Sequence, residues 1–311
     1  MEKQLSLKLF EKPQNPSPNW VVLGENLAVL PCIPSLSVDL IYIDPPFNTG
    51  KEQARTRIAA VQAESGDRVG FGGKRYQTVE LGRTGYDDSF DDYLGFLKPR
   101  LNEAYRVLAP HGALYFHIDY REAHYCKVLL DSIFGRDNFI NEIIWSYDYG
   151  AKPKTRWPAK HDTIFFFAKN VDNYVFNVEA IEREPYMAPG LVTPEKAALG
   201  KLPTDVWWHT IVPTNGSERT GYPTQKPLGI LKRIISASSN PGDLVLDFFA
   251  GSGTAGEAAL GLGRRFILVD NSPEAIRVMQ QRFNKYGGIH FLNAKSPGWD
   301  EQLVDDIRKG K

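Results

Sequence analysis

Cysteine is scarce in this chain, which has 311 residues and only two thiols, Cys32 and Cys126. Two cysteines cannot form a disulfide framework or a four-thiolate zinc site. The six histidines show no metal-ligand spacing with them, so we expect no structural metal. Both cysteines are expected to occupy packed positions on helices.

Long apolar runs are also missing. The longest apolar stretches, such as residues 163–168, have the length of a strand and fall far short of the roughly 18 residues of a membrane-spanning helix. The first eight residues lack the apolar core of a signal peptide. We therefore expect a cytoplasmic protein with no membrane partner.

The chain carries no net charge, because 37 Lys and Arg residues balance 37 Asp and Glu residues. The whole molecule thus offers no general attraction to a polyanion, and any surface for nucleic acid must be a local patch. Hydrophobic residues make up 42% and charged residues 24%, as in ordinary globular proteins. The length predicts about two domains or one large α/β unit.

Strand and helix signals alternate along most of the chain. Strands are predicted at residues 20–23, 38–43, 113–118, 163–167, 244–249 and 265–270, and helices at 93–108, 122–134, 228–235 and 255–262. This alternation predicts an α/β fold, with a doubly wound, mostly parallel sheet covered by helices on both faces.

Two segments do not fit the alternation. Residues 51–85 are glycine-rich and carry seven Lys and Arg residues against four acids, so we expect a long, basic, mobile loop. Residues 171–221 are irregular and rich in Pro and Gly, and are expected to form an inserted smaller subdomain. Residues 1–170 and 222–311 would then make up the main domain.

The tetrapeptide Asp44-Pro45-Pro46-Phe47 follows the predicted strand 38–43. Ligands of open α/β sheets bind at the carboxyl ends of strands. Because prolines have no N–H, carbonyl oxygens are the polar backbone groups there. A carboxylate, carbonyl acceptors and an aromatic ring suit a planar base with an exocyclic amino group. The alternative is a strand-ending turn with a packed Phe47.

A second motif runs from Asp247 to Thr254, around Gly251 and Gly253. The glycines allow a tight turn and a close approach to a ligand, and Asp270, about 20 residues on, is placed to bind a ribose diol. A dinucleotide would explain such a turn as well. However, the third glycine of the dinucleotide fingerprint is missing, and Asp247 would repel a pyrophosphate. A cationic ligand such as S-adenosylmethionine is expected to fit better.

These motifs, with Tyr222-Pro-Thr-Gln-Lys-Pro227 between them, resemble the β group of amino-group DNA methyltransferases, which methylate adenine N6 or cytosine N4 in DNA. They are similar in particular to restriction–modification methylases. The resemblance covers about residues 20–50, 86–170 and 205–285. It implies a permuted, Rossmann-like, S-adenosylmethionine-dependent methyltransferase fold, in which residues 171–221 are a target-recognition insert.

The resemblance also implies roles at the matching positions. Asp44 and a carbonyl oxygen of Pro45 or Pro46 would hold the target amine, and Phe47 would stack on the flipped base. The residues implied to bind the cofactor are Glu25, Thr224, Lys226, Asp247, Phe249, Ala250, Gly251, Gly253, Thr254 and Asp270. Glu25 stands where the family usually has Asp.

A basic segment is the strongest candidate for phosphate contacts. It contains Lys152, Lys154, Arg156 and Lys160, with Trp157 among them and no acid from 149 to 160. A solvated charged loop is the alternative. With residues 51–85, this segment is expected to wall a cleft over Asp44.

Other titratable residues are assigned structural roles. His117, near the end of a predicted strand, is expected to be a packed, hydrogen-bonded core residue. The acids Asp87, Asp88, Asp91 and Asp92 are expected to cap a helix or face solvent.

We therefore expect a site-specific methyltransferase that acts on adenine N6 of a flipped base in double-stranded DNA. Adenine is favoured because Asp44 opens the tetrapeptide, whereas cytosine relatives more often begin with Ser. Cytosine N4 is the alternative, and a non-catalytic DNA-binding module or an RNA or protein amino-methyltransferase stays open. A homodimer and a cognate restriction endonuclease are the further partners that the resemblance suggests.

Overall fold

The computed structural model describes residues 19–50, 53–62, 68–69, 74–86, 88–150, 152–213, 215–296, 298, 300 and 303. Its strands are β1 (Asn19–Leu23), β2 (Val38–Ile43), β3 (Gln53–Gln62), β4 (Arg68–Val69), β5 (Arg75–Tyr86), β6 (Leu108–Asp119), β7 (Phe139–Ser146), β8 (His161–Ala168), β9 (Val206–Trp208), β10 (Leu244–Asp247), β11 (Arg265–Asp270) and β12 (Ile289–Asn293). The α-helices are α1 (Asn26–Val29), α2 (Tyr93–Val107), α3 (Ala123–Phe134), α4 (Pro194–Leu199), α5 (Leu228–Ser238), α6 (Thr254–Gly261) and α7 (Pro273–Phe283).

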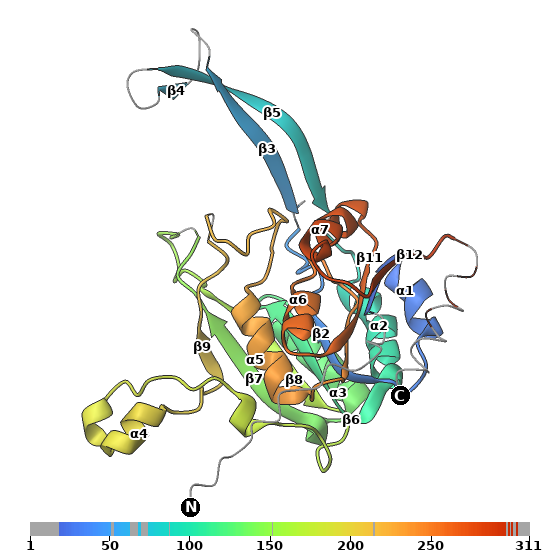
Figure 1. Ribbon diagram of the computed structural model, residues 1–311, viewed down its shortest axis with the longest axis vertical. Coiled ribbons are helices and arrows are strands. Elements are labelled where there is room, and N and C mark those ends of the chain that lie inside the picture. Colours follow the sequence, from blue (N-terminus) through green and yellow to red (C-terminus); the bar gives the residue numbers. More distant parts are fainter. Residues whose placement is uncertain are drawn as a thin grey trace, which may run out of the picture.

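A nine-stranded sheet forms the centre of the molecule, in the order β12-β1-β11-β10-β2-β6-β8-β7-β9 (Figure 1). Six consecutive strands, from β12 to β6, run parallel. Among the described strands of this sheet, β8 alone runs opposite to the rest. The predicted doubly wound, mostly parallel sheet is confirmed.

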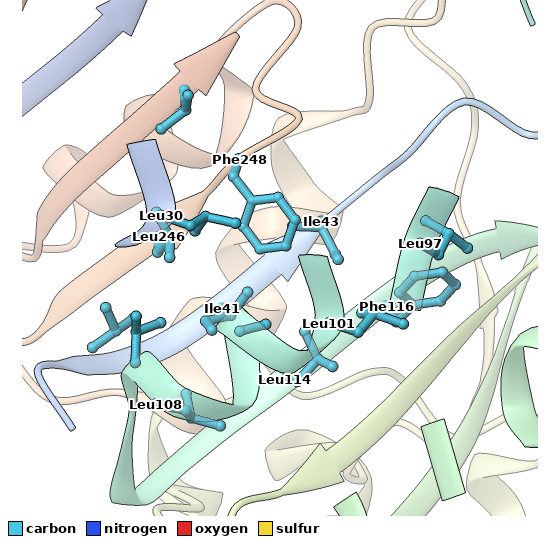
Figure 2. Close-up of a cluster of buried hydrophobic side chains, with 14 of the residues drawn as sticks. Leu30, Ile41, Ile43, Leu97, Leu101, Leu108, Leu114, Phe116, Leu246 and Phe248 are labelled. Carbon is cyan, nitrogen blue, oxygen red and sulfur yellow. The ribbon is translucent and has the colours of Figure 1, made fainter. Parts of the chain in front are cut away.

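Helices cover both faces of this sheet because its buried strands are apolar on both sides. In β2, Ile41 and Ile43 point to the face covered by α1, α2 and α3. Leu40 and Tyr42 point to the opposite face, under α5, α6 and α7. Figure 2 shows the first of these two core layers, in which β2, β6 and β10 meet the helix α2. The two layers fix the sheet edge on which the site is built.

The segment 51–85, expected to be a loop, contains a β-hairpin instead. β3 pairs with β5 in antiparallel register from Gln53↔Tyr86 to Gln62↔Tyr76, and β4 adds a third short strand. The hairpin rises away from the body of the molecule, at the top of Figure 1. The loop expectation is wrong because cross-strand pairing supplies the backbone hydrogen bonds that a loop would leave to water.

The segment 171–221 is irregular, as expected, but it is not wholly separate from the main domain. β9, within it, pairs with β7 at the register Ile144↔Val206 and forms the edge of the large sheet. The stretch around α4 lies at the lower left of Figure 1, on the side away from the hairpin. The expected boundaries therefore cut through the sheet.

Most predicted elements are found within a few residues of the expected positions. The predicted strand 244–249 ends at Asp247, so that Phe248 and Phe249 belong to the turn. β7, β12 and α7 were not predicted. Within the described residues, no helix has the length and apolarity needed to cross a bilayer.

Candidate active site

The site lies where the order of strands reverses. β2 and β10 are neighbours in the sheet, with Leu40 opposite Val245 and Ile41 opposite Leu246. The chain continues from β2 to β6 on one side, and from β10 to β11 on the other. Asp44 follows β2 and Asp247 ends β10, so both acids stand at this topological switch point, where α/β sheets bind ligands.

Two cavities meet at this edge. The smaller, of about 360 Å³, is bordered by the glycine turn after β10 and by the carboxyl ends of β1 and β11. The larger, of about 670 Å³, lies over Phe47, Trp145 and Tyr147. The residues that line both cavities are Asp44, Tyr222, Thr224, Gln225 and Lys226. Asp44 therefore lies between the two cavities, where a ligand group in one cavity can contact a ligand group in the other.

The two oxygens of Asp44 have different surroundings. Oδ2 accepts a hydrogen bond from the Lys226 ammonium at 2.5 Å. Oδ1 is buried and has no hydrogen-bond partner among the described residues, and the His117 Nδ1 atom is 3.8 Å away. A buried carboxylate oxygen without a donor is costly, and it marks a position where a ligand N–H would be accepted.

The rest of the tetrapeptide presents carbonyls and a ring. The Pro46 carbonyl already accepts a hydrogen bond from the Tyr93 hydroxyl at 2.5 Å. Pro45 lines the larger cavity beside Asp44, so the Pro45 carbonyl is the better-placed partner for a ligand amine. The Phe47 ring lines the same cavity, 5.8 Å from the His117 ring between centroids.

The backbone after Phe47 is held by a buried acid. Asp88, only 1% exposed, accepts hydrogen bonds from the Asn48 N–H at 2.7 Å and from the Thr49 hydroxyl at 2.6 Å. The Gly50 N–H donates to the Asp88 carbonyl at 2.9 Å, at the base of the β3–β5 hairpin. The expectation that Asp88 caps a helix or faces solvent is therefore wrong, because this acid holds the turn that follows Phe47. Asp92 does cap α2, accepting from the Gly95 N–H at 2.8 Å.

A buried hydrogen-bonded chain runs beside Asp44. The Tyr42 hydroxyl is 2.8 Å from His117 Nδ1, and His117 Nε2 is 3.1 Å from Asp162. The Tyr147 hydroxyl donates to the other Asp162 oxygen at 3.0 Å. Burial and the charges of Asp44, Asp247 and Asp162 raise the pKa of Tyr42 well above its usual value, so its hydroxyl keeps its proton. His117 is a packed, hydrogen-bonded residue, as expected, and it also borders the site.

The pKa of Asp162 is lowered in spite of its burial. Burial by itself raises this pKa, but the hydrogen bond and charge of His117, the charge of Lys226 and the Tyr147 hydrogen bond together outweigh it. Asp162 is therefore an anion within the larger cavity, which it helps to line.

The turn after β10 requires glycine at two positions. Gly251 has a φ of 49° and Gly253 a φ of 75°, both in the left-handed region. A Cβ on Gly253 would also lie 2.7 Å from Cγ of Met279. The Gly251 N–H donates to Asp270 Oδ2 at 2.8 Å, and Gly253 is the N-cap of α6. The turn therefore brings bare backbone and a helix N-terminus to the smaller cavity.

Buried acids give the smaller cavity its electrostatic character. Burial raises the pKa of Asp247 well above its usual value, and the charges of Asp44 and Asp270 raise it further. Burial is also the main reason why the pKa of Asp270 is raised. Buried acids held this close together favour a ligand with positive charge, because a cation offsets the repulsion among them.

The far end of the smaller cavity is fixed by Glu25. Its carboxylate accepts from Arg100 at 2.5 Å and from Asn271 at 3.3 Å. Arg100 also donates to Asn26 at 2.7 Å, and Asn26 donates to the Phe248 carbonyl at 3.1 Å. This network ties the end of β1 to the turn after β10.

Comparison with known proteins identifies the family. The family model described as DNA methylase, for N6 and N4 enzymes, matches residues 38–281. The DNA adenine methyltransferase YhdJ of Escherichia coli (strain K12) is 33% identical, covering 85% of this chain and 82% of YhdJ. The type II methyltransferase M.HpaI of Haemophilus parainfluenzae is 30% identical, covering 87% and 76%. The chain belongs to the N6/N4 DNA methylase family.

A solved structure shows the same fold at low sequence identity. The structure of the PvuII DNA methyltransferase, named cytosine-N4-specific, superposes with a TM-score of 0.58 at 16% identity, covering 94% of this chain and 93% of that one. The Rossmann-like methyltransferase fold and the family resemblance are thus confirmed, and the chain is a DNA methyltransferase.

S-adenosylmethionine is the methyl donor of the N6/N4 DNA methylases, as predicted. The residues of this chain fit it. The buried acids Asp247 and Asp270 suit its positive charges, and the open turn at Gly251 leaves room for a close approach. When bound, this cofactor supplies an electrophilic methyl group.

Nearly all the residues predicted to bind the cofactor line the smaller cavity: Glu25, Thr224, Lys226, Asp247, Phe249, Ala250, Gly251, Thr254 and Asp270. Gly253 does not line it and shapes the turn instead. The catalytic candidates Asp44, Pro45 and Phe47 line the larger cavity, and Pro46 lines the smaller. Their individual roles stay predictions.

The predicted DNA-contacting residues lie outside both cavities, in the segment between β7 and β8. Lys152, Lys154 and Arg156 are exposed. Lys160 donates to the Gly150 carbonyl at 2.9 Å and so closes the base of this segment. Gly150 lines the larger cavity, so the segment begins at its edge.

Tyr42, Tyr147 and Arg121, which lie at this site, were not predicted. Tyr42, Asp162 and Tyr147 join His117 in the buried chain, and Arg121 pairs with Asp119 at the larger cavity. One signal was present in the sequence: residues 117–119 and residues 161–162 flank strand ends of the predicted sheet. Only the antiparallel pairing of β6 with β8 brings these ends together.

Proposed function

We propose that this DNA methylase transfers the methyl group of S-adenosylmethionine to N6 of an adenine that has swung out of double-stranded DNA. The observation that carries the proposal is the buried Asp44 Oδ1 atom, which has no hydrogen-bond partner among the described residues and lies on the wall shared by the two cavities. The smaller cavity would hold the cofactor and the larger the base.

The chemistry requires acceptors at the target amine. An aromatic amino group is a poor nucleophile because its lone pair is delocalised into the ring. Asp44 and the Pro45 carbonyl would accept its two N–H bonds, which favours a pyramidal nitrogen and turns the lone pair towards the smaller cavity. Asp44 would take up the proton that the nitrogen loses after the transfer, and Phe47 would hold the ring in place by stacking.

Adenine is the proposed base for two reasons. The tetrapeptide begins with Asp44, and the relative YhdJ is named a DNA adenine methyltransferase. The fold does not discriminate, because the PvuII enzyme shares it and is named cytosine-N4-specific. Cytosine N4 is therefore the second candidate.

The proposed DNA surface surrounds the opening of the larger cavity. Lys152, Lys154 and Arg156 would contact phosphates at one side. Residues 211–221, the part of the expected recognition insert that borders the cavity through Ile211 and Arg219, would approach the base or its neighbours. The part around α4 lies away from the hairpin and is a weaker candidate for target recognition.

Single-molecule sequencing of DNA from cells that express the protein tests the function. We expect N6-methyladenine at one short motif, and no such mark when Asp44→Ala is expressed instead. N4-methylcytosine at a motif would move the assignment to cytosine. Unmodified DNA, with purified protein that is folded and supplied with S-adenosylmethionine, would contradict the proposal.

A further inference from the structure

Lys226 covers the two groups that the target base would need. Its ammonium lies 2.5 Å from Asp44 Oδ2 and 4.8 Å from the centroid of the Phe47 ring. Its side chain is only 10% exposed, so the contact is made inside the protein and is not a loose surface pair. In this arrangement Asp44 is engaged as an ion pair, and the face of Phe47 is partly occupied by a cation.

The same lysine also faces the other cavity. Lys226 lines both the smaller and the larger cavity, and its charge acts on Asp247 as well as on Asp162. Several carboxylates therefore compete for one ammonium group. The ammonium therefore stands where anions on both sides of the wall attract it.

The backbone at Lys226 is held in place by its neighbours in the chain. Pro227, the next residue, is the N-cap of α5, and buried residues of that helix pack in the core. Thr224 has a φ of 57°, in the left-handed region that a β-branched residue rarely adopts. The backbone at Lys226 is thus anchored on its C-terminal side, and the four-carbon side chain can swing from a fixed point.

We propose that Lys226 is a cofactor-operated latch on the base site: it pairs with Asp44 when no cofactor is bound, and it transfers its ammonium to the cofactor's carboxylate when the cofactor enters. This inference rests on the proposed function. The cofactor's carboxylate would compete with Asp44 for the Lys226 ammonium. The released Asp44 and Phe47 would then accept the base.

The latch has a thermodynamic consequence for the binding of cofactor and base. If the cofactor frees the base site, cofactor and base capture favour each other, and each must raise the affinity for the other by the same factor. The carboxylate of the cofactor, and not its adenosine part, is the element that carries this coupling.

The test uses the full-length protein and a duplex that contains the sequenced target site, with 2-aminopurine in place of the target base. Its fluorescence reports the unstacked base. S-adenosylhomocysteine, which has the carboxylate, should increase base capture about tenfold. 5′-Methylthioadenosine, which lacks the amino-acid part, should bind in the same cavity and leave base capture unchanged. Equal effects of the two compounds would overturn the inference, with no variant needed.

Substitution of Lys226 provides a second test of the latch. In Lys226→Met, base capture should no longer depend on S-adenosylhomocysteine, and the DNA should no longer tighten binding of that compound. Lys232→Met, which changes an exposed lysine on α5, the helix that follows Lys226, is the matched control and should keep the wild-type coupling. Coupling retained in Lys226→Met would overturn the latch.

The two proposals fail differently. If the protein binds no S-adenosylhomocysteine and methylates no DNA, the proposed function is wrong. If it binds the compound and methylates DNA, but the compound's carboxylate does not govern base capture, the latch alone is wrong.

Discussion

At the scale of single residues, the acids of the site have two different kinds of surroundings. Asp44 is held by a lysine, with its second oxygen left without a hydrogen-bond donor among the described residues. Asp247 forms no ion pair with a lysine or arginine among the described residues, and its pKa is raised by burial. The first acid is arranged to accept a hydrogen bond, and the second to receive a cation.

Asp44→Ala should separate cofactor binding from catalysis. Loss of the carboxylate removes an acceptor for the target amine, so kcat should fall by roughly 10³-fold or more. Binding of S-adenosylhomocysteine, followed by calorimetry, should not weaken, because the groups expected to bind the cofactor are intact and Asp44 no longer competes for Lys226. Near wild-type turnover would rule out the proposed role of Asp44.

Asp247→Asn should stabilise the protein and weaken cofactor binding. A carboxyl whose pKa is raised by folding binds more protons in the native state than in the unfolded state, so wild-type stability falls as the pH rises above the usual value of 3.8. The variant has no carboxyl group at this position, so it does not lose this stability as the pH rises. Its free energy of unfolding should therefore exceed that of the wild type by about 1 kcal/mol or more at pH 7.5. Urea unfolding at pH 5 and pH 7.5 measures the difference.

The same substitution removes the negative charge from the cofactor cavity, so the Kd for S-adenosylmethionine should rise at least about tenfold. A variant that is less stable than the wild type at pH 7.5, or that binds the cofactor normally, would contradict this account of Asp247.

Individual motifs at the site could be predicted from the sequence, but their contacts could not. Asp44 and the glycine turn stand out because each follows a strand signal and has its own chemistry. The Asp44–Lys226 pair joins residues 182 positions apart. The His117–Asp162 contact depends on β6 pairing with β8. Both require the order of strands in the sheet, which local patterns do not contain.

At the scale of elements, the β3–β5 hairpin differs most from the rest of the fold. It belongs to a separate three-stranded sheet, and it leaves and rejoins the body at neighbouring backbone positions, where Gly50 donates to the Asp88 carbonyl at 2.9 Å. Its sequence carries an excess of Lys and Arg over acids. An arm of this kind suits contact with a nucleic-acid backbone.

A variant that replaces residues 53–86 with a short Gly-Ser linker should remain folded, because the strands of this segment form a three-stranded sheet of their own and none of them belongs to the nine-stranded sheet. S-adenosylhomocysteine should bind as in the wild type, and the Kd for DNA should rise about tenfold or more. Fluorescence anisotropy with a labelled duplex measures the change. Undiminished DNA affinity would exclude the hairpin from the interface.

The hairpin also shows why the expected loop was wrong. Its strands begin and end among glycines, and residues 53–62 alternate only weakly between apolar and polar types. A strand whose two faces do not differ in polarity gives little of the two-residue periodicity by which strands are recognised. By contrast β2, β10 and β11 are mostly apolar and buried on both faces, and such strands are easily recognised in a sequence.

At the scale of the whole molecule, charge is balanced, and the attraction to DNA must be local. The chain has no net charge, yet Lys152, Lys154 and Arg156 are exposed together beside the larger cavity. Trp157, next to them, is 94% exposed. This segment should account for much of the salt dependence of binding.

Charge reversal at Lys152, Lys154 and Arg156 should therefore weaken DNA binding and flatten its dependence on salt. The slope of log K against log salt should become less steep by about 2 to 3, since each phosphate that the protein neutralises adds about 0.9 to its steepness. Lys98→Glu, an exposed lysine on α2, is the control and should leave the slope unchanged. Equal slopes in the triple variant and the wild type would remove this segment from the interface.

The scarcity of thiols has a practical consequence for following the hairpin. Burial raises the pKa of Cys126 to about 12, and burial together with the charge of Asp300 raises that of Cys32. Both native sulfurs should react slowly with maleimides near neutral pH, because the thiolate is the reactive form. A cysteine engineered at exposed Val61 would then take up a spin label or dye almost alone, so that a distance from the hairpin to a labelled duplex could be measured in an otherwise native background.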